Sequence, residues 1–504
     1  MKFTNWQQFE AYLDELGLFR MEPGQERITR VLESMGLKRP PFALVQGAGT
    51  NGKGSSCTFL ASLARSHGLV SGLHSSPHFV SVRERVRIFR PEALSGATAE
   101  QCTAHGVNNS ARPGRAGELL PEQTWLEAAN LVMEHGGETL TYFELVTTLA
   151  VTLMRSAGVD LAVMETGLGG RFDATTALDA DLVFFTPIDM DHAEVLGPTL
   201  RDIARDKAGA MRRGVPAISS AQRPEVRQEL EQAANALDAP LSFVDGISIL
   251  PDDLQPRRVP RLPDFAAQNN HKDHHHAHHH DHHHDDEPPA PIARVNLGLQ
   301  GRHQLNNAAL ALQTWRALRD GSHGAGFGLL VGKSAADLAA AEFCGLTKAW
   351  LPGRMQFIEA PASLSHPPLI IDGAHNPHGL SALGHSLALL GVAPAVTIFS
   401  CLRDKQPENL APHLRVLSGG LILVPQIKDN PRAMDAEELA NLIGRPAVAV
   451  PDLATAIEMG TASMLERLPE AAEQSIHECR YPMLICGSLY LLAEFFALYP
   501  EYLE

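Results

Sequence analysis

The sequence lacks the features of a secreted or membrane-bound chain. Residues 1–19 contain no charged segment followed by an apolar one, as a signal peptide requires. The most apolar late stretch, 483–499, includes Gly487, Ser488 and Glu494, so it predicts a buried strand and helix rather than a membrane span. The 6 cysteines form no C-x-x-C pair, which is typical of free thiols in a reducing compartment. We expect a cytoplasmic protein that binds no membrane.

Basic residues are also scarce. Lys and Arg number 42 against 58 Asp and Glu, which gives a formal net charge of −16. Binding to a nucleic-acid backbone requires clustered Lys and Arg, so we expect no nucleic-acid partner. A single phosphate ligand is not excluded, because backbone N–H groups and one lysine can hold it. We expect a monomer that acts on small molecules.

The chain has no fixed-period repeat, and 44% hydrophobic with 20% charged residues excludes a disordered or fibrous protein. A length of 504 residues predicts more than one domain, because single cores stop growing at roughly 250–300 residues. Short apolar runs alternate with helical patterns, which predicts an α/β fold with mostly parallel sheets. The expected strands are 42–45, 161–164, 182–186, 369–371, 396–399, 421–424 and 483–486.

Two segments interrupt this alternation. Residues 269–290 are rich in histidine and cannot bury apolar surface, so we expect a solvated surface insertion there. The segment Leu-Pro-Gly-Arg at 351–354 separates two long α/β stretches. We therefore predict an N-terminal domain over residues 1–352 with a P-loop-type, mostly parallel sheet. A smaller, Rossmann-like α/β domain follows over residues 353–504.

The strongest local signal is a glycine-rich turn, GAGTNGKGS at 47–55, between an expected strand and an expected helix. This context is typical of a P-loop, in which backbone N–H groups and a lysine surround phosphate oxygens. Lys53 would reach the terminal phosphates, while Gly54 displaces the usual Mg²⁺-binding hydroxyl to Ser55. A glycine-rich surface turn is the alternative. The pattern predicts phosphate binding by Thr50, Asn51, Gly52, Lys53, Gly54 and Ser55.

Further motifs follow along nearly the whole chain. They are SSPH at 75–78, ERVRI at 84–88, TYFE at 141–144, ETGLGGRFDAT at 165–175, DH at 191–192, KAG at 207–209, NNAA at 306–309, PGR at 352–354, DGAHNPH at 372–378 and CGSLY at 486–490. With the glycine-rich turn, they resemble the folylpolyglutamate synthase/dihydrofolate synthase family. This family belongs to the Mur-type superfamily of ATP-dependent amide ligases. The resemblance implies an ATP-binding Mur-type domain followed by a glutamate-ligase domain.

The resemblance implies an enzyme of folate biosynthesis and one-carbon metabolism. Such a ligase adds L-glutamate to dihydropteroate, to a reduced folate such as tetrahydrofolate, or to both. ATP would phosphorylate the acceptor carboxyl, and the glutamate amine would then attack the acyl phosphate. The implied cofactors are ATP and Mg²⁺. The sequence leaves open which acceptor is used and how long a polyglutamate tail becomes.

A carboxylate after an expected strand suits Mg²⁺, because this ion prefers oxygen ligands and open α/β sheets bind ligands at strand ends. The resemblance implies Mg²⁺ contacts from Ser76, Glu165 and His192, and from Lys207 if that lysine is carbamylated. From the residues alone, Glu165 could instead complement a helix dipole. His192 could make structural hydrogen bonds, and Lys207 could be a surface lysine.

The remaining site residues also come from the resemblance. It implies ATP contacts from Asn307, Arg354 and Asp372, and catalytic roles for Lys53, Lys207 and His375. It implies pterin or folate binding by Thr141, Phe172, Asp173 and Ala174, and more loosely by residues 22–24. Arg354 suits phosphate because its guanidinium is always charged, and Asp173 could accept pterin N–H groups. Arg354 could instead be a hinge arginine, and Asp372 a helix cap.

The histidine run at 271–284 raises a different function class. Its ten histidines are good ligands for Zn²⁺ or Ni²⁺, so we expect adventitious metal binding on a loop without a catalytic role. A P-loop metallochaperone that stores metal there is one alternative, although a guanine-specific switch needs an N-K-x-D segment, which the sequence lacks. Another Mur-type amino-acid ligase is the second alternative, but the motifs at 75–78 and 165–175 favour the folate branch.

Overall fold

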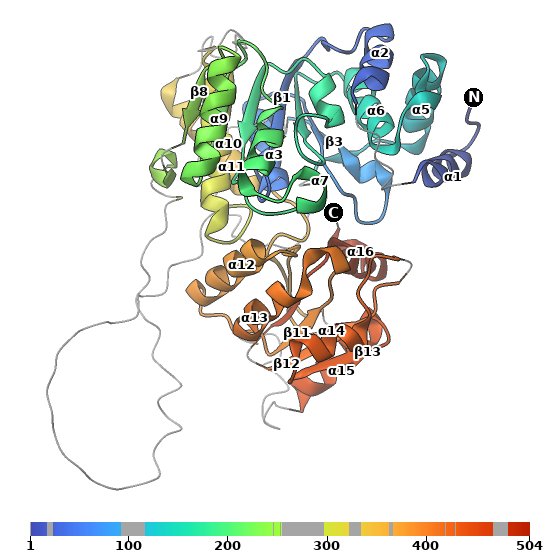
Figure 1. Ribbon diagram of the computed structural model, residues 1–504, viewed down its shortest axis with the longest axis vertical. Coiled ribbons are helices and arrows are strands. Elements are labelled where there is room, and N and C mark those ends of the chain that lie inside the picture. The colour runs from blue at the N-terminus through green and yellow to red at the C-terminus, as the bar shows by residue number, and fades with distance from the viewer. Residues whose placement is uncertain are drawn as a thin grey trace, which may run out of the picture.

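The computed structural model describes residues 2–17, 24–91, 116–244, 246–251, 254, 297–321, 334–361, 366–418, 420–428, 430–466 and 482–503. These residues form two sheets, each with helices on both faces (Figure 1). The expected α/β class is confirmed. The expected insertion at 269–290, residues 22–23 of the loosely assigned pterin segment, and two cysteines, 102 and 479, lie outside these ranges.

The first sheet has eight strands in the order β4-β3-β2-β5-β1-β6-β7-β8. Neighbouring strands are parallel except for the β2–β3 and β3–β4 pairs, so an antiparallel edge flanks a parallel centre. Strand β1 lies between β5 and β6. The strands are β1 (Ala43–Ala48), β2 (Ser71–His74), β3 (Val86–Phe89), β4 (Glu118–Leu119), β5 (Leu161–Glu165), β6 (Leu182–Phe185), β7 (Ala217–Ser219) and β8 (Leu241–Phe243).

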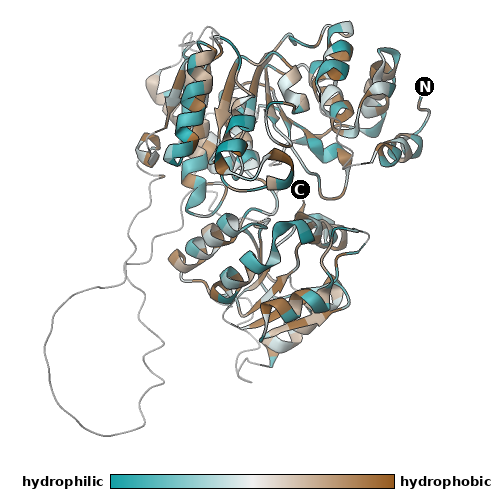
Figure 2. Ribbon diagram, in the orientation of Figure 1, coloured by the Kyte–Doolittle hydropathy of each residue, from teal (hydrophilic) through white to brown (hydrophobic). Residues whose placement is uncertain are grey.

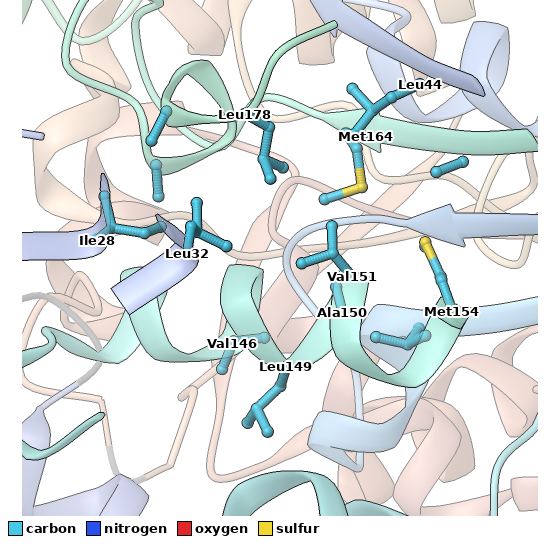
Figure 3. Close-up of a cluster of buried hydrophobic side chains, with 14 of the residues drawn as sticks. Ile28, Leu32, Leu44, Val146, Leu149, Ala150, Val151, Met154, Met164 and Leu178 are labelled. Atoms are coloured by element: carbon cyan, nitrogen blue, oxygen red, sulfur yellow. The ribbon is translucent and has the colours of Figure 1, made fainter. Parts of the chain in front are cut away.

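Helices cover both faces of this sheet because successive strand residues point to opposite sides. Leu44 of β1 packs into one core, and Val45 packs into the other. The first core is formed by α1 (Trp6–Leu16), α2 (Glu26–Ser34), α5 (Glu122–Glu134), α6 (Tyr142–Ser156), α8 (Leu200–Ala208) and α9 (Pro224–Ala236). Figure 3 shows Leu44 and Met164 from the strands above side chains of α2 and α6. The second core is formed by α3 (Lys53–Ser66), α10 (His303–Arg319) and α11 (Ala335–Lys348).

The second sheet has six strands in the order β13-β12-β11-β14-β10-β9, parallel except for the β9–β10 pair. The strands are β9 (Gln356–Ile358), β10 (Leu369–Ile371), β11 (Val396–Phe399), β12 (Leu421–Pro425), β13 (Ala447–Val450) and β14 (Met483–Cys486). One face packs on α12 (Pro377–Leu389), α13 (Pro407–Leu417) and α14 (Ala436–Ile443). The other packs on α15 (Leu453–Leu465) and α16 (Leu489–Leu498). Figure 2 shows the hydrophobic strands enclosed by helices with hydrophilic outer faces.

Short elements complete the description. They are helix α7 (Ala193–Leu196) and the 3₁₀ turns η1 (Val82–Arg85), η2 (Gly137–Thr139), η3 (Ala174–Ala177), η4 (Gly246–Ile249), η7 (Arg403–Lys405) and η9 (Pro500–Tyr502). Within the described ranges, no helix is long and apolar enough to span a membrane. The expected buried strand and helix at 483–499 are confirmed as β14 and α16. Cys57, Cys344, Cys401 and Cys486 are buried and form no disulfide bond.

Every expected strand is present, and three match to the residue, namely β10, β11 and β14. The sequence did not predict β2, β3, β4, β7, β8, β9 or β13. Most of these strands are short or carry polar residues, such as SGLH in β2 and VRIF in β3, so they lack a long apolar run. Strand β13, with the sequence AVAV, is apolar throughout and was missed all the same. Helix α3 begins at Lys53, which places the lysine in the first helical turn.

Close packing fixes α3, the helix that carries Lys53. Every side chain from Ser55 to Arg65 is buried, and α11 crosses α3 at Gly345. A Cβ atom at Gly345 would lie 2.8 Å from the Cα atom of Leu63. The Gly345 carbonyl also accepts a hydrogen bond of 2.7 Å from Ser62 Oγ. The absence of a side chain at Gly345 therefore sets the distance between α11 and α3.

We predict that Gly345→Ala lowers the free energy of unfolding by about 1–3 kcal/mol, because the new methyl group overpacks the helix contact. Thermal unfolding measures the effect as a lower Tm. The control is Ala339→Ser on the exposed side of α11, which should change stability by about 0.5 kcal/mol or less. Equal Tm values for the two variants would contradict the described packing.

Candidate active site

The turn after β1 lies at the carboxyl end of the parallel strands. Gly49 and Gly52 have φ angles of 137° and 90°, a region that favours glycine. A Cβ atom at Gly49 would collide with Thr186, and one at Gly52 would collide with Asn307. Thr50 fixes the turn to the loop after β6, because its Oγ1 donates to the Asp189 carbonyl at 3.0 Å. The glycines thus allow the close approach that a phosphate-binding loop requires.

Two lysines donate to carbonyl oxygens of this turn. Lys53 Nζ contacts Gly49 O at 3.3 Å and Thr50 O at 3.2 Å. Lys207 Nζ contacts Gly49 O at 2.8 Å and is 4% exposed, so the alternative of a surface lysine is wrong. Burial, together with the charge of Lys53, lowers the pKa of Lys207 to about 7. Two amines from distant segments therefore lie at one turn, where an anion would offset their charge.

Glu165 lies across from this turn as the last residue of β5. It pairs in register with Gly47 of β1, and its Oε2 accepts a 3.1 Å hydrogen bond from Ser76 N–H. A Cβ atom at Gly54 would lie 3.5 Å from Glu165 Oε2. Burial raises the pKa of Glu165, while Lys53 and Arg354 oppose that rise. Because Glu165 ends a strand, the alternative of an acid in the first turn of a helix is wrong.

Asp191 and His192 follow β6 and contact the second sheet. Asp191 Oδ1 lies 2.8 Å from Lys405 Nζ of η7, and both side chains are about nine-tenths buried, with 12% and 10% exposed. His192 has a φ of 53° and remains partly exposed. Burial and Lys405 lower the pKa of His192 to about 4, so its imidazole is neutral at pH 7. A neutral imidazole can bind a cation.

His375 also has a neutral ring at pH 7, because burial and Lys405 lower its pKa to about 4. Its Nδ1 lies 2.7 Å from Gly373 O. A carbonyl only accepts hydrogen bonds, so Nδ1 carries the proton and Nε2 is an acceptor. The loop around His375 therefore offers a proton acceptor.

Hydrogen bonds connect the phosphate-loop turn directly to the loop after β10. Asn376 Nδ2 donates to Asn51 Oδ1 at 3.0 Å, and Asn51 Nδ2 contacts His378 Nδ1 at 3.1 Å. The sequence assigned no role to Asn376 or His378, although both lie in the motif at 372–378. Lys405 was also missed, and no pattern in the sequence marks it.

The residues of the three other predicted ATP contacts form hydrogen bonds with neighbouring groups of the protein. Asn307 is buried beside Gly52, and its Nδ2 donates to Gln304 Oε1 at 2.9 Å. Asp372 accepts hydrogen bonds of 2.8 Å from the N–H groups of Met355 and Ala374. The N-cap of α12 is Asn376, so the alternative role of Asp372 as a helix cap is wrong. Arg354 Nη1 donates to Gly353 O at 3.0 Å, and its charge acts on both Glu165 and Asp372.

The predicted pterin residues are less accessible than expected. Asp173 Oδ2 accepts from the N–H groups of Gly167 and Leu168, and Oδ1 accepts from the N–H and hydroxyl of Thr175. These four bonds use all acceptor positions of the carboxylate, so this geometry gives no support to pterin binding by Asp173. Ala174 is buried, and Thr141 is the N-cap residue of α6, whose N–H and hydroxyl both donate to Glu144 Oε2. The Phe172 side chain is 52% exposed and free to contact a ligand.

We also tested whether these residues suit a divalent cation. Among the described residues, no three His, Cys, Asp or Glu side chains lie close enough together to hold a metal ion. Mg²⁺ keeps several water ligands and needs few from the protein, so the buried Glu165 carboxylate suits it. The Ser76 backbone already contacts this carboxylate. The chemistry of these groups fits the predicted ion.

Comparisons with known proteins agree with this arrangement. Residues 353–467 match the family model described as Mur ligase, glutamate ligase domain. The dihydrofolate synthase/folylpolyglutamate synthase of Escherichia coli (strain K12) is 29% identical over 488 residues, which cover 96% of this chain and 93% of that protein. A probable bifunctional folylpolyglutamate synthase/dihydropteroate synthase of Haloferax volcanii is 29% identical over 489 residues and 96% of this chain. The chain spans about half (49%) of that protein's length.

The fold also matches E. coli FolC in complex with DHPP and ADP, with a TM-score of 0.69 and 26% identity over 99% of this chain and 98% of that chain. Together, the two sheets, the lysine-bearing turn and these matches define a ligase of the Mur type. Within that class, the chain belongs to the folylpolyglutamate synthase/dihydrofolate synthase family. The resemblance of the sequence motifs is thereby confirmed.

The lowered pKa of Lys207 predicts a pH-dependent stability. Between the ordinary pKa of 10.5 and the folded value of about 7, only the unfolded chain protonates this amine. The unfolded state then binds more protons, so stability falls as the pH falls through this window and levels off below it. In bicarbonate-free buffer, the Tm of the wild type should therefore fall relative to that of Lys207→Met between pH 10 and pH 7.

Lys428→Met serves as the control, because the Lys428 side chain is 61% exposed. Its Tm should follow that of the wild type across the same range. Parallel pH curves for the wild type and Lys207→Met would show that burial does not perturb the amine.

Proposed function

We propose that this chain is an ATP-dependent ligase that adds L-glutamate to dihydropteroate, to a reduced folate, or to both, through an acyl phosphate. The observation that carries this proposal is the placement of both Lys53 and the Glu165 carboxylate at one glycine-rich turn. Contacts from the second sheet reach the same turn through Asn51. The names of the E. coli relative and the ADP complex of E. coli FolC support this assignment.

In this proposal, the turn from Thr50 to Ser55 binds the ATP phosphates and Lys53 neutralises their charge. Asn307, Arg354 and Asp372 position the nucleotide from the neighbouring elements. Bound Mg²⁺ would supply charge neutralisation at the phosphates, with Ser76, Glu165 and His192 as its protein contacts. Asn307 supports this arrangement because it already packs against Gly52.

Lys207 suits carbamylation, because the neutral amine is the form that reacts with CO₂ and a pKa of about 7 leaves much of it neutral. The product is an anion, which would offset the charge of Lys53 and could contact Mg²⁺. His375 would accept a proton from the incoming glutamate amine at its free Nε2. On the acceptor side, Thr141, Phe172, Asp173 and Ala174 would line the pterin, with Phe172 as the direct contact and Asp173 as the residue that shapes the loop.

We further propose two domains, 1–352 and 353–504, and the two separate sheets support this division. The protein would act as a cytoplasmic monomer on small molecules and would bind no nucleic acid. The absence of a disulfide at the buried residues Cys57, Cys344, Cys401 and Cys486 is consistent with a reducing compartment. Any Zn²⁺ or Ni²⁺ on the loop at 271–284 would be adventitious.

The first test concerns Lys53. We predict that Lys53→Ala lowers kcat by about 10²–10³-fold, because a charge that stabilises the transferring phosphoryl group is lost. Glutamate-dependent ATP consumption, measured separately with dihydropteroate and with tetrahydrofolate, gives the readout and also identifies the acceptor. Lys38→Ala, on the surface beside Glu33, is the control and should retain full activity. Activity near that of the wild type in Lys53→Ala would refute the phosphate-loop assignment.

The same assay separates the alternatives. A metallochaperone would prefer GTP and release metal on hydrolysis without an acceptor. Another Mur-type ligase would consume ATP with a different acid and a different amino acid. Turnover that depends on a pteroate or folate together with glutamate excludes both.

The second test concerns the histidine run. We predict that deletion of residues 271–284 leaves kcat and the KM values within about twofold, because a solvated surface insertion tolerates removal. The deletion should abolish binding of the chain to immobilised Ni²⁺. Loss of ligase activity in the deletion variant would show that the run takes part in the reaction.

A further inference from the structure

Arg85 is a buried cation to which neither the sequence analysis nor the proposed function assigns a role. It ends η1, directly before β3, and is 3% exposed. Its Nε donates to His78 Nδ1 at 2.9 Å, and its guanidinium lies 5.4 Å from the centre of the Tyr142 ring. Burial and Arg85 together lower the pKa of His78 to about 3, so this partner is a neutral acceptor. Arg85 therefore contacts an imidazole and an aromatic ring.

The described residues provide no counter-ion for Arg85. The adjacent Glu84 uses both carboxylate oxygens on the backbone N–H groups of residues 79–81, at 3.0, 2.8 and 2.7 Å. Within the described ranges, no Asp or Glu oxygen lies within 4.0 Å of the guanidinium. Its Nη atoms donate to no described group, yet they are not among the polar atoms that the protein encloses completely. The free end of Arg85 therefore reaches solvent.

Several buried charges elsewhere among the described residues form direct ion pairs. Glu342 pairs with Arg316 at 2.6 Å and with Arg319 at 2.8 Å, and Asp191 pairs with Lys405. A buried charge without a partner is costly, so such a group is retained where a ligand supplies the missing charge. A guanidinium presents a planar pair of donors that matches a carboxylate.

We propose that Arg85 binds the carboxylate of the acceptor, the group that becomes the new amide. This inference rests on the proposed function and names one contact within it. Tyr142, under the guanidinium, directly follows Thr141 on the proposed acceptor side. His78 lies two residues after Ser76, whose N–H binds Glu165.

The position of Arg85 also indicates that its ligand is the acceptor rather than ATP. The phosphate side of the site already has Lys53 and Lys207 on the turn after β1, with Arg354 nearby. Arg85 belongs to a different part of the fold, as the last residue of η1 beside Tyr142 of α6. Its charge acts on Glu165, so an acid held by Arg85 would lie near the carboxylate proposed to contact Mg²⁺. This is where the acceptor and the terminal phosphate must meet.

The test compares an acid with its uncharged amide. Calorimetry would measure binding of dihydropteroate and of its carboxamide to the wild type and to Arg85→Gln. If the wild type turns over only tetrahydrofolate, that acid and its γ-carboxamide replace the pair. The wild type should bind the acid at least about tenfold more tightly than the amide, and Arg85→Gln should bind both equally. The KM for the acceptor should rise about tenfold or more, while the KM values for ATP and glutamate stay within about twofold.

Two further variants control for folding and charge. Arg90→Gln removes an exposed arginine at the end of β3, which pairs with Glu118, and should behave as the wild type. Arg85→Gln removes an uncompensated charge, so its Tm should not fall below that of the wild type. If Arg85→Gln does not fold, Arg85→Lys decides the question, because it keeps the charge but loses the paired donors. It should therefore reduce the preference for the acid.

The proposal is overturned if the substituted protein still prefers the acid, or if the KM for ATP or for glutamate rises instead. A wild type that consumes ATP with neither acceptor would refute the proposed function. In that case, the acid-against-amide comparison would still show whether Arg85 binds a carboxylate.

Discussion

The site depends on the positive charge collected at the turn after β1. Lys53 and Lys207 reach carbonyl oxygens of that turn from segments far apart in sequence, and both come close to Gly49. Two cations this close repel each other, and burial of Lys207 increases the cost. Glu165 is a negative charge near Lys53, and its own pKa reflects both burial and that lysine. The fold therefore concentrates charge where a triphosphate would offset it.

The part of the chain that forms the second sheet contributes polar groups to this centre. Asn376 and His378 meet Asn51, and Lys405 meets Asp191. Hydrogen bonds and ion pairs depend on direction and distance, so they specify one arrangement of the contacting loops more narrowly than apolar surfaces would. The two hydrophobic cores of the second sheet are built mainly from its own strands and helices, and Phe79 of the N-terminal region packs against one of them. The contacts between the two parts therefore combine polar groups near the turn with an aromatic contact between Phe79 and Phe496.

Much of the fold could be predicted from the sequence because apolar runs such as 396–399 and 483–486 form central strands, buried on both faces. Strands that contain polar residues could not be predicted in this way. Strand β2 contains Ser71 and Gly72, and β3 contains Arg87, so burial at these positions depends on neighbours that the local pattern does not reveal. The glycine-rich turn was found because its backbone conformation requires glycine at fixed positions.

The site was predicted less completely than the fold. Motifs identified the loops, but a motif does not say which of its side chains holds the loop and which remains available. Glu84 and Arg85 are adjacent in sequence. The Glu84 carboxylate accepts hydrogen bonds from the backbone of the preceding loop, whereas the Nη atoms of Arg85 remain available to a ligand. Lys405 contacts the site only through the tertiary structure, so no local pattern could reveal it.

Asp173 shows how a side chain that holds a loop in place affects the interpretation of mutagenesis. Four donors converge on its two oxygens, and an asparagine in its place would turn an NH₂ group toward two of them. The segment from Gly167 to Thr175 would then lose its shape, and Phe172 would move with it. An inactive Asp173→Asn enzyme would report a deformed loop, and its kinetics would carry no information about how a pterin ring is recognised.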